Sequence, residues 1–191
     1  MRFYQKLFLG LSLCFLSATQ LFADDAPINN SRVVIETNMG ALTLELYADK
    51  APLTVANFLR YVDDGHYKGT LFHRVIAGFM IQGGGFDEQW QQRPTQPPIK
   101  NEANNGLKNL QGTVAMARTS EVDSATAQFF INLVDNPSLD HGANGYGYAV
   151  FGKVVAGMDT VVNIGRSATT QRYPYQDVPK QAIVITNIRR L

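Results

Sequence analysis

The feature that most constrains the fold of this chain is a series of short, strand-like apolar runs separated by turn residues at close intervals. The runs are rich in Val, Ile, Phe and Thr, which are typical of strands. They cover residues 33–37, 41–46, 71–75, 79–82, 113–117, 129–133, 150–155 and 182–188. The regular strand–helix alternation that builds a parallel sheet is absent. The pattern therefore predicts a mainly β fold, an antiparallel barrel or sandwich.

Two segments have helical spacing. Residues 52–63 begin with Pro52, carry apolar residues at helical intervals and are followed by Gly65, so they predict a helix with a defined start and stop. A shorter helix is predicted at residues 158–164. Residues 83–109 have no periodic pattern, and we expect an ordered loop that crosses the surface.

The N-terminus has the layout of a secretory signal peptide. Arg2 and Lys6 precede an apolar run over residues 7–16, which is too short to span a bilayer core of about 30 Å. Cleavage is expected after Ala23; an uncleaved amphipathic or buried helix is the alternative. The expected organisation is a cleavable signal peptide at 1–23, a flexible segment at 24–31 and one domain at 32–191.

Charge and cysteine content narrow the function classes. The chain has 17 Lys and Arg against 16 Asp and Glu, a formal net charge of +1. A dedicated nucleic-acid binder normally carries a basic stripe, so we expect no nucleic-acid partner. The only cysteine, Cys14, falls within the expected signal peptide. A mature chain without thiols cannot form disulfides and is compatible with an oxidising compartment.

Several segments resemble known catalytic or ligand-binding motifs but lack a residue or a neighbouring element that the motif requires. Residues 147–153 match most of a phosphate-binding loop, but Val154 stands where Ser or Thr is required. Ser138, Asp140 and His141 lack the GxSxG turn of a hydrolase. The three histidines form no closely spaced pair of zinc ligands. We therefore expect no metal and no cofactor.

Ordered motifs over most of the chain carry the functional signal. They are FHRVI at 72–76, GFMIQGG at 78–84, KNEA at 100–103, GTVAMAR at 112–118, SATAQFFIN at 124–132, LDH at 139–141 and VFGKVVAGM at 150–158. In these motifs the sequence resembles the cyclophilin family of peptidyl-prolyl isomerases over residues 32–191, most of all the exported cyclophilins of Gram-negative bacteria. The resemblance implies a closed eight-stranded antiparallel β-barrel capped by two α-helices, with the site on its outer face.

The chemistry of such a site can be argued from the reaction. Rotation about an X–Pro bond meets a barrier near 18–20 kcal/mol and breaks no covalent bond. A catalyst must therefore bind the twisted amide better than the planar one. Twisting returns a lone pair to the prolyl nitrogen, which a permanently protonated arginine can stabilise. On a strand Arg74 lies on the face opposite to His73 and Val75, and the resemblance places the catalytic arginine at this position.

The resemblance also implies the substrate-binding residues. Gln82 and Gln128 are expected to bind the substrate backbone and to position Arg74. Ala117 and Arg118 are expected to receive the residues before proline through main-chain bonds. The apolar slot for the proline ring is implied to consist of Phe79, Met80, Phe130 and Leu139.

Two positions depart from the family pattern. Ser138 stands where the family often has Trp, or Phe in bacterial forms. Tyr148, which the resemblance implies to be a substrate-binding residue, stands where many members have His. One wall of the slot is thus less aromatic. We expect peptide binding to be retained and cyclosporin binding to be weak.

We therefore expect a periplasmic, cofactor-free prolyl isomerase that acts on proline-containing peptides and unfolded exported proteins. A monomer without a stable membrane anchor is expected. Two alternatives stay open: a non-catalytic proline-peptide binding module or chaperone on the same fold, and an exported β-domain that binds small ligands. The presence of Arg74 favours the enzyme, because binding modules can lose this residue.

Overall fold

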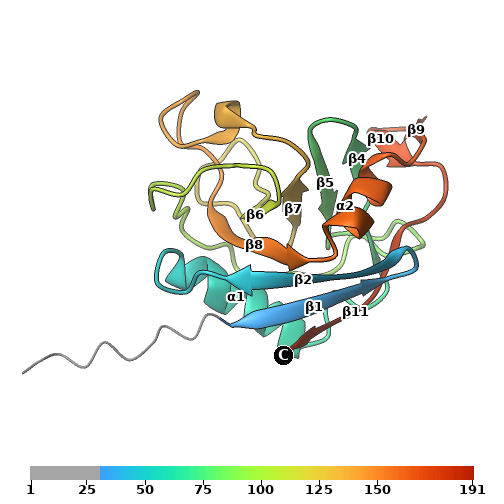
Figure 1. Ribbon diagram of the computed structural model, residues 1–191, viewed down its shortest axis with the longest axis horizontal. Helices are drawn as coiled ribbons and strands as arrows, with labels where there is room; N and C mark the ends of the chain where they lie inside the picture. The colour runs from blue at the N-terminus through green and yellow to red at the C-terminus, as the bar shows by residue number, and fades with distance from the viewer. Residues whose placement is uncertain (1–30) are drawn as a thin grey trace, which may run out of the picture.

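The computed structural model describes residues 31–191, and the expected signal peptide lies outside this part of the chain. The described residues form a strongly curled nine-stranded sheet, a separate two-stranded sheet and two α-helices (Figure 1). In chain order the elements are β1 Arg32–Thr37, β2 Gly40–Leu46, α1 Pro52–Asp63, β3 Thr70–Leu71, β4 Arg74–Ile76, β5 Met80–Gly83, β6 Thr113–Met116, β7 Phe129–Asn132, the 3-10 helix η1 Pro137–Leu139, β8 Val150–Ala156, α2 Met158–Gly165, β9 Thr169–Arg172, β10 Tyr175–Pro179 and β11 Val184–Arg190.

The large sheet is open. Its strand order is β3-β11-β1-β2-β8-β6-β7-β5-β4, and every pair is antiparallel. The run predicted as one strand at residues 71–75 divides in two, because β3 pairs with β11 whereas β4 pairs with β5. Within residues 31–191 no ladder joins β3 to β4. The mainly β fold with two helices is confirmed, and the prediction of a closed eight-stranded barrel is wrong.

The alternating pattern of the first two strands fixes which of their faces is buried. Val33 and Ile35 of β1 are fully buried, as are Leu44 and Leu46 of β2. The residues between them, Val34 and Glu45, lie on the opposite face and are only partly buried, as period-two alternation requires. These strands supply one wall of the main hydrophobic core.

Helix α1 packs its apolar face into this core. The Phe58 ring lies 5.2 Å from the rings of Tyr67 and Phe151 and 5.6 Å from that of Phe129, measured between centroids. Aromatic pairs at these separations add specific contacts to the area that they bury. The helix starts at Pro52 and ends at Asp63, as predicted from the sequence.

The N-terminus of α1 is capped from a distant loop. Ala51, at the N-cap position, has no side chain that could accept a hydrogen bond. Instead the Glu102 carboxylate accepts from the backbone N–H groups of Leu53 and Thr54, at 3.1 and 2.8 Å, and from the Thr54 hydroxyl at 2.7 Å. The carboxylate accepts hydrogen bonds from N–H groups that have no partner within the helix, and its negative charge is attracted to the positive end of the helix dipole. The contact ties the long loop over residues 83–109 to the helix.

Strand β7 separates the core from a second apolar surface. Phe129 joins the main core, and Phe130, the next residue, faces the opposite side, as the alternation predicts. There Phe130 packs with Met80, Ala115 and Val150 in a smaller apolar cluster. This cluster forms the floor of the candidate site.

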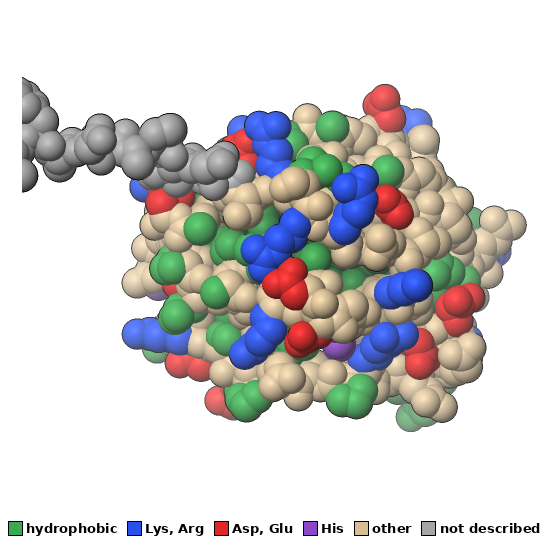
Figure 2. Space-filling model, turned by 90° about the horizontal axis from the view of Figure 1, so that it is seen from below, with side chains coloured by type: hydrophobic (Ala, Val, Ile, Leu, Met, Phe, Trp, Pro, Cys, Tyr) green, Lys and Arg blue, Asp and Glu red, His purple; other side chains and the backbone are tan. Residues whose placement is uncertain are grey.

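The charged groups of the surface are largely mixed in sign. The space-filling view shows Lys and Arg side chains interspersed with Asp and Glu over one face (Figure 2). Several form ion pairs, among them Arg32 with Glu45 and Arg189 with Glu36. None of the described helices is long and apolar enough to cross a membrane.

Candidate active site

A pocket of about 240 Å³ opens over the apolar cluster beside β5 and β7. Of the site residues expected from the sequence, all except Gln128 line it. They are Arg74, Phe79, Met80, Gln82, Ala117, Arg118, Phe130, Leu139 and Tyr148. The structure thus brings together side chains from the strands β4, β5 and β7, from η1, and from loop residues next to β5, β6 and β8.

The floor of the pocket is apolar and well buried. Met80 is 3% exposed and Phe130 is 4% exposed. Phe79 and Leu139 are partly buried beside them. Such a floor favours an apolar ring over a polar ligand group, because it offers area to cover and few polar atoms to satisfy.

One wall is built from Tyr148 and Arg118. The Tyr148 ring stands edge-on to Phe130, at 5.7 Å and 82°, and the Arg118 guanidinium lies 4.7 Å from the Tyr148 ring centre. Arg118 also donates from Nε to the Gly147 carbonyl at 3.0 Å and from Nη1 to the Thr119 carbonyl at 2.9 Å. The guanidinium is therefore engaged with the protein and packs as part of the wall.

Gln128 lies next to the pocket and is connected to it by a hydrogen bond. Gln82 Nε2 donates to Gln128 Oε1 at 2.9 Å. Gln128 also lines an adjacent groove of about 440 Å³, and Arg74 and Gln82 line both the groove and the pocket. The two amides thus form one connected polar edge beside Arg74.

Arg74 lies on the edge strand β4, opposite Gln82 in the ladder. Its neighbours His73 and Val75 are buried at 6% and 1% exposure, whereas the Arg74 side chain is 45% exposed, so the predicted alternation is confirmed. Arg74 Nε lies 3.5 Å from Oδ2 of Asp177 on β10. Sequence reasoning missed Asp177, since an exposed aspartate near a turn carries no signal of a distant partner.

His73, the residue before Arg74, is buried on the opposite face of the chain and is uncharged at neutral pH. Burial lowers the pKa of His73 to about 4, and the nearby Arg74 charge acts in the same direction. Among the described residues its Nδ1 has no hydrogen-bond partner, and the ring packs against Phe86 at 4.9 Å. At neutral pH the positive charges that line the pocket therefore belong to Arg74 and Arg118.

Within residues 31–191, no group of three or more His, Cys, Asp and Glu side chains lies close enough together to hold a metal ion. The chemistry that the pocket offers is an apolar slot, amide donors and acceptors, and a fixed positive charge. These groups can bind and polarise an amide without forming a covalent bond to it.

The described fold is a curled antiparallel sheet that carries an apolar pocket with Arg74 at its edge. A comparison with protein families identifies the class of this protein: residues 32–190 match the family described as cyclophilin type peptidyl-prolyl cis-trans isomerase/CLD. The chain belongs to this family, and it is a peptidyl-prolyl cis-trans isomerase.

Curated relatives and solved structures agree with this assignment. The chain is 50% identical to peptidyl-prolyl cis-trans isomerase A of Dickeya dadantii, over 96% of this chain and 97% of the relative. It is 54% identical to peptidyl-prolyl cis-trans isomerase B of Escherichia coli, over 82% of this chain and 97% of the relative. A Cryptosporidium parvum cyclophilin type isomerase superposes with a TM-score of 0.71 at 28% identity, covering 85% of this chain and 98% of that structure.

Proposed function

We propose that the isomerase binds the proline ring of its substrate in the slot formed by Phe79, Met80, Phe130 and Leu139, with Arg74 as the catalytic residue. The observation that carries this proposal is that the Arg74 guanidinium and the apolar floor line one pocket. Burial of the ring against Met80 and Phe130 holds one side of the X–Pro bond, so that the other side can rotate.

Catalysis then follows from differential binding. In the planar amide the prolyl nitrogen shares its electrons with the carbonyl, and in the twisted amide it regains a lone pair. An N–H of Arg74 donates to that lone pair and stabilises the twisted state selectively. Each 1.36 kcal/mol of selective stabilisation raises the rate about tenfold. No proton transfer and no covalent intermediate are needed.

The polar edge orients the substrate. Gln82 and Gln128, joined by their hydrogen bond, offer amide groups to the substrate backbone beside Arg74. Ala117 and Arg118 receive the residues before proline, and Arg118 does so through its main chain because its guanidinium is engaged elsewhere. A second Cryptosporidium parvum structure, determined in the presence of the dipeptide Ala-Pro, supports binding of short X–Pro peptides by this family.

We further propose that residues 1–23 are a signal peptide removed after Ala23, and that the mature chain assists the folding of exported proteins in the periplasm. The charged start, the short apolar run and the small residue at position 23 support this. In this proposal residues 32–191 form a monomeric domain without a membrane anchor. N-terminal sequencing of the exported protein tests cleavage after Ala23, and light scattering tests the monomeric state.

The decisive experiment is a protease-coupled isomerase assay on residues 24–191 with an Ala-Pro peptide. We expect Arg74→Ala to lower kcat/KM by about 100-fold or more, equivalent to roughly 3 kcal/mol of lost transition-state stabilisation. The circular dichroism spectrum should not change, because the side chain is half-exposed.

Arg189→Ala is the matched control. It also removes an exposed arginine from a surface ion pair, here with Glu36 of β1, and it should retain full activity. An inactive wild type would favour a non-catalytic binding module on the same fold. A fully active Arg74→Ala variant would refute the assignment of the catalytic residue.

A further inference from the structure

We propose that Asp177 of the β9–β10 hairpin is a positioning residue that orients the Arg74 guanidinium for catalysis. The inference rests on the proposed role of Arg74 as the catalytic residue. The Asp177 carboxylate lies 3.5 Å from Arg74 Nε, and both side chains are partly exposed, at 37% and 45%. The hairpin belongs to a small sheet separate from the curled one, so the site is built by two sheets.

The local backbone turns Asp177 out of the regular strand pattern. The pairing of β10 with β9 shifts register between Tyr175 and Val178, which marks a β-bulge. Asp177 lies within this bulge and has φ +57°, in the left-handed region that few residues other than glycine adopt. Bulges next to active sites commonly redirect a side chain, and unusual backbone conformations persist where the surrounding structure holds them. Here the redirected side chain is the one that meets Arg74.

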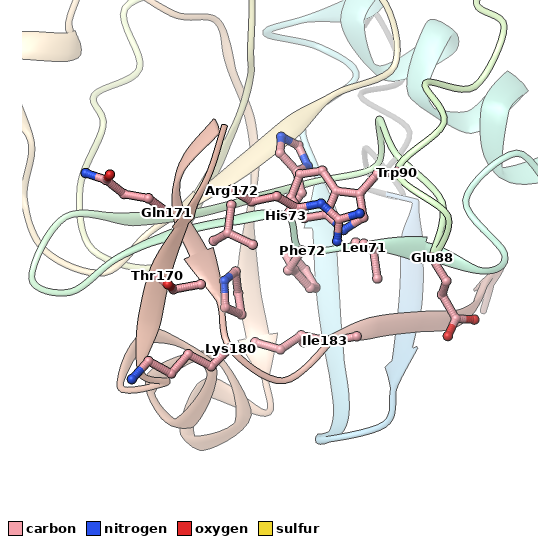
Figure 3. Close-up of a pocket in the computed structure, with 13 residues that line it drawn as sticks. Leu71, Phe72, His73, Glu88, Trp90, Thr170, Gln171, Arg172, Lys180 and Ile183 are labelled. Atoms are coloured by element: carbon pink, nitrogen blue, oxygen red, sulfur yellow. The ribbon is translucent and has the colours of Figure 1, made fainter. Parts of the chain in front are cut away.

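Aromatic contacts anchor the hairpin to the rest of the molecule. The Tyr175 ring lies 5.2 Å from both the Phe86 ring and the Trp90 ring, and the Arg172 guanidinium lies 4.7 Å from the Trp90 ring centre. Figure 3 shows Arg172 beside Trp90 at a pocket of about 390 Å³ between the hairpin and the segment that carries His73. The carboxylate of Asp177 therefore extends from a packed support.

The geometry of the ion pair leaves the reactive end of Arg74 free. A guanidinium has five N–H donors in a fixed plane, and the ion pair places the Asp177 carboxylate on the Nε side of that plane. The terminal nitrogens remain available to the substrate. Holding Nε restricts the rotation of a long side chain, so less freedom is lost when the twisted amide binds. An exposed ion pair contributes little to folding stability, and we therefore expect its effect in the rate.

The test compares three variants in the isomerase assay: Asp177→Asn, Asp177→Glu and the control Glu36→Gln. Asp177→Asn keeps the size of the side chain and its tolerance of positive φ. We expect it to lower kcat about fivefold with KM changed less than twofold. Asp177→Glu keeps the negative charge, so we expect its kcat to be higher than that of Asp177→Asn and lower than that of the wild type. Glu36→Gln removes a similarly exposed carboxylate, paired with Arg189 at 3.4 Å, and should leave the rate unchanged.

A second measurement follows Arg74 directly. We expect the 15N order parameter of the Arg74 Nε–H group to fall in Asp177→Asn, to below about 0.6, while backbone order parameters stay unchanged. An unchanged or increased kcat in Asp177→Asn, or an unchanged Arg74 order parameter, would overturn the inference. Either result leaves the role of Arg74 intact, since that role is decided separately by Arg74→Ala.

Discussion

Ser138 is exposed in the middle of η1, next to Leu139, which lines the pocket, and the resemblance to the family implies an aromatic residue at its position. Resemblance to the family implies that cyclosporin occupies the proline slot and contacts a tryptophan at position 138. An indole offers a large apolar face and an N–H donor, and serine offers neither. The loss of such a buried aromatic contact costs a few kcal/mol, or about two to three decades of affinity.

We therefore predict that cyclosporin inhibits this isomerase weakly and that Ser138→Trp strengthens the inhibition. Pro137 fixes the backbone before the site of substitution, so a partial gain is expected. Peptide turnover should change little, because Ser138 does not line the pocket. The measurement is a cyclosporin titration of both proteins in the isomerase assay. Tight inhibition of the wild type, or equal inhibition of the two, would contradict the prediction.

At the residue scale, the pocket residues were implied by the resemblance to the cyclophilin family, and nine of the ten implied residues line one pocket. Phe130 and Gln82 meet across the β5–β7 ladder, and Arg74 and Gln82 meet across the β4–β5 ladder. Asp177 could not be predicted in this way. Its contact with Arg74 depends on a bulge and on the packing of a separate hairpin, and neither leaves a periodic pattern in the sequence.

Among the elements, helix α1 depends on a cap supplied from outside its own sequence. We predict that Glu102→Ala lowers the free energy of unfolding by about 1–2 kcal/mol, since two backbone N–H groups lose their acceptor at the positive end of the helix dipole. Urea unfolding monitored by circular dichroism measures the change. Isomerase activity at low denaturant should be retained, because Glu102 does not line the pocket.

The control for this prediction is Glu121→Ala. Glu121 is exposed in the loop before β7, so Glu121→Ala is the same type of substitution at a site away from any helix terminus. It should leave the unfolding midpoint within experimental error. Equal stability of Glu102→Ala and the wild type would show that the contacts of the carboxylate with Leu53 and Thr54 contribute nothing measurable.

The elements differ in how well the sequence predicts them. Helix α1 was predicted to its ends because Pro52 and Gly65 mark its boundaries. Strand β9 was missed because its residues are mostly exposed, and β10 was missed because only its last two residues are buried. A strand that buries neither face lacks the alternation by which strands are recognised.

For the whole molecule, the sequence correctly predicted the mainly β class, whereas the closed barrel that the resemblance implied is wrong, because the sheet is open. Alternation shows which face of a strand is buried but not which strands become neighbours. The segment from Thr70 to Ile76 changes partner between β3 and β4, and within it the Phe72 N–H donates to the Ile183 carbonyl at 2.9 Å. This change of partner makes two short edge strands from one predicted strand.

The stability of the whole molecule should depend on pH through its buried histidines, and above all through His73. Burial lowers the pKa of His73 to about 4 from the ordinary value of 6.5. A histidine with a lowered pKa binds fewer protons when folded than when unfolded at pH values between about 4 and 6.5. Stability therefore decreases as the pH falls through this interval and is fully present above it. Burial also lowers the pKa of His66, which acts in the same direction.

We predict that acidification from pH 7 to pH 4.5 costs the wild type about 2 kcal/mol more than it costs His73→Leu, in which the buried ring nitrogens are replaced by apolar groups. Urea unfolding at both pH values measures the difference. The control His141→Leu changes an exposed histidine and should keep the pH dependence of the wild type. If His73→Leu loses as much stability on acidification as the wild type, His73 is charged in the folded state at pH 4.5. In that case the buried environment inferred behind Arg74 would be wrong, because a protonated ring there would have to be solvated or paired.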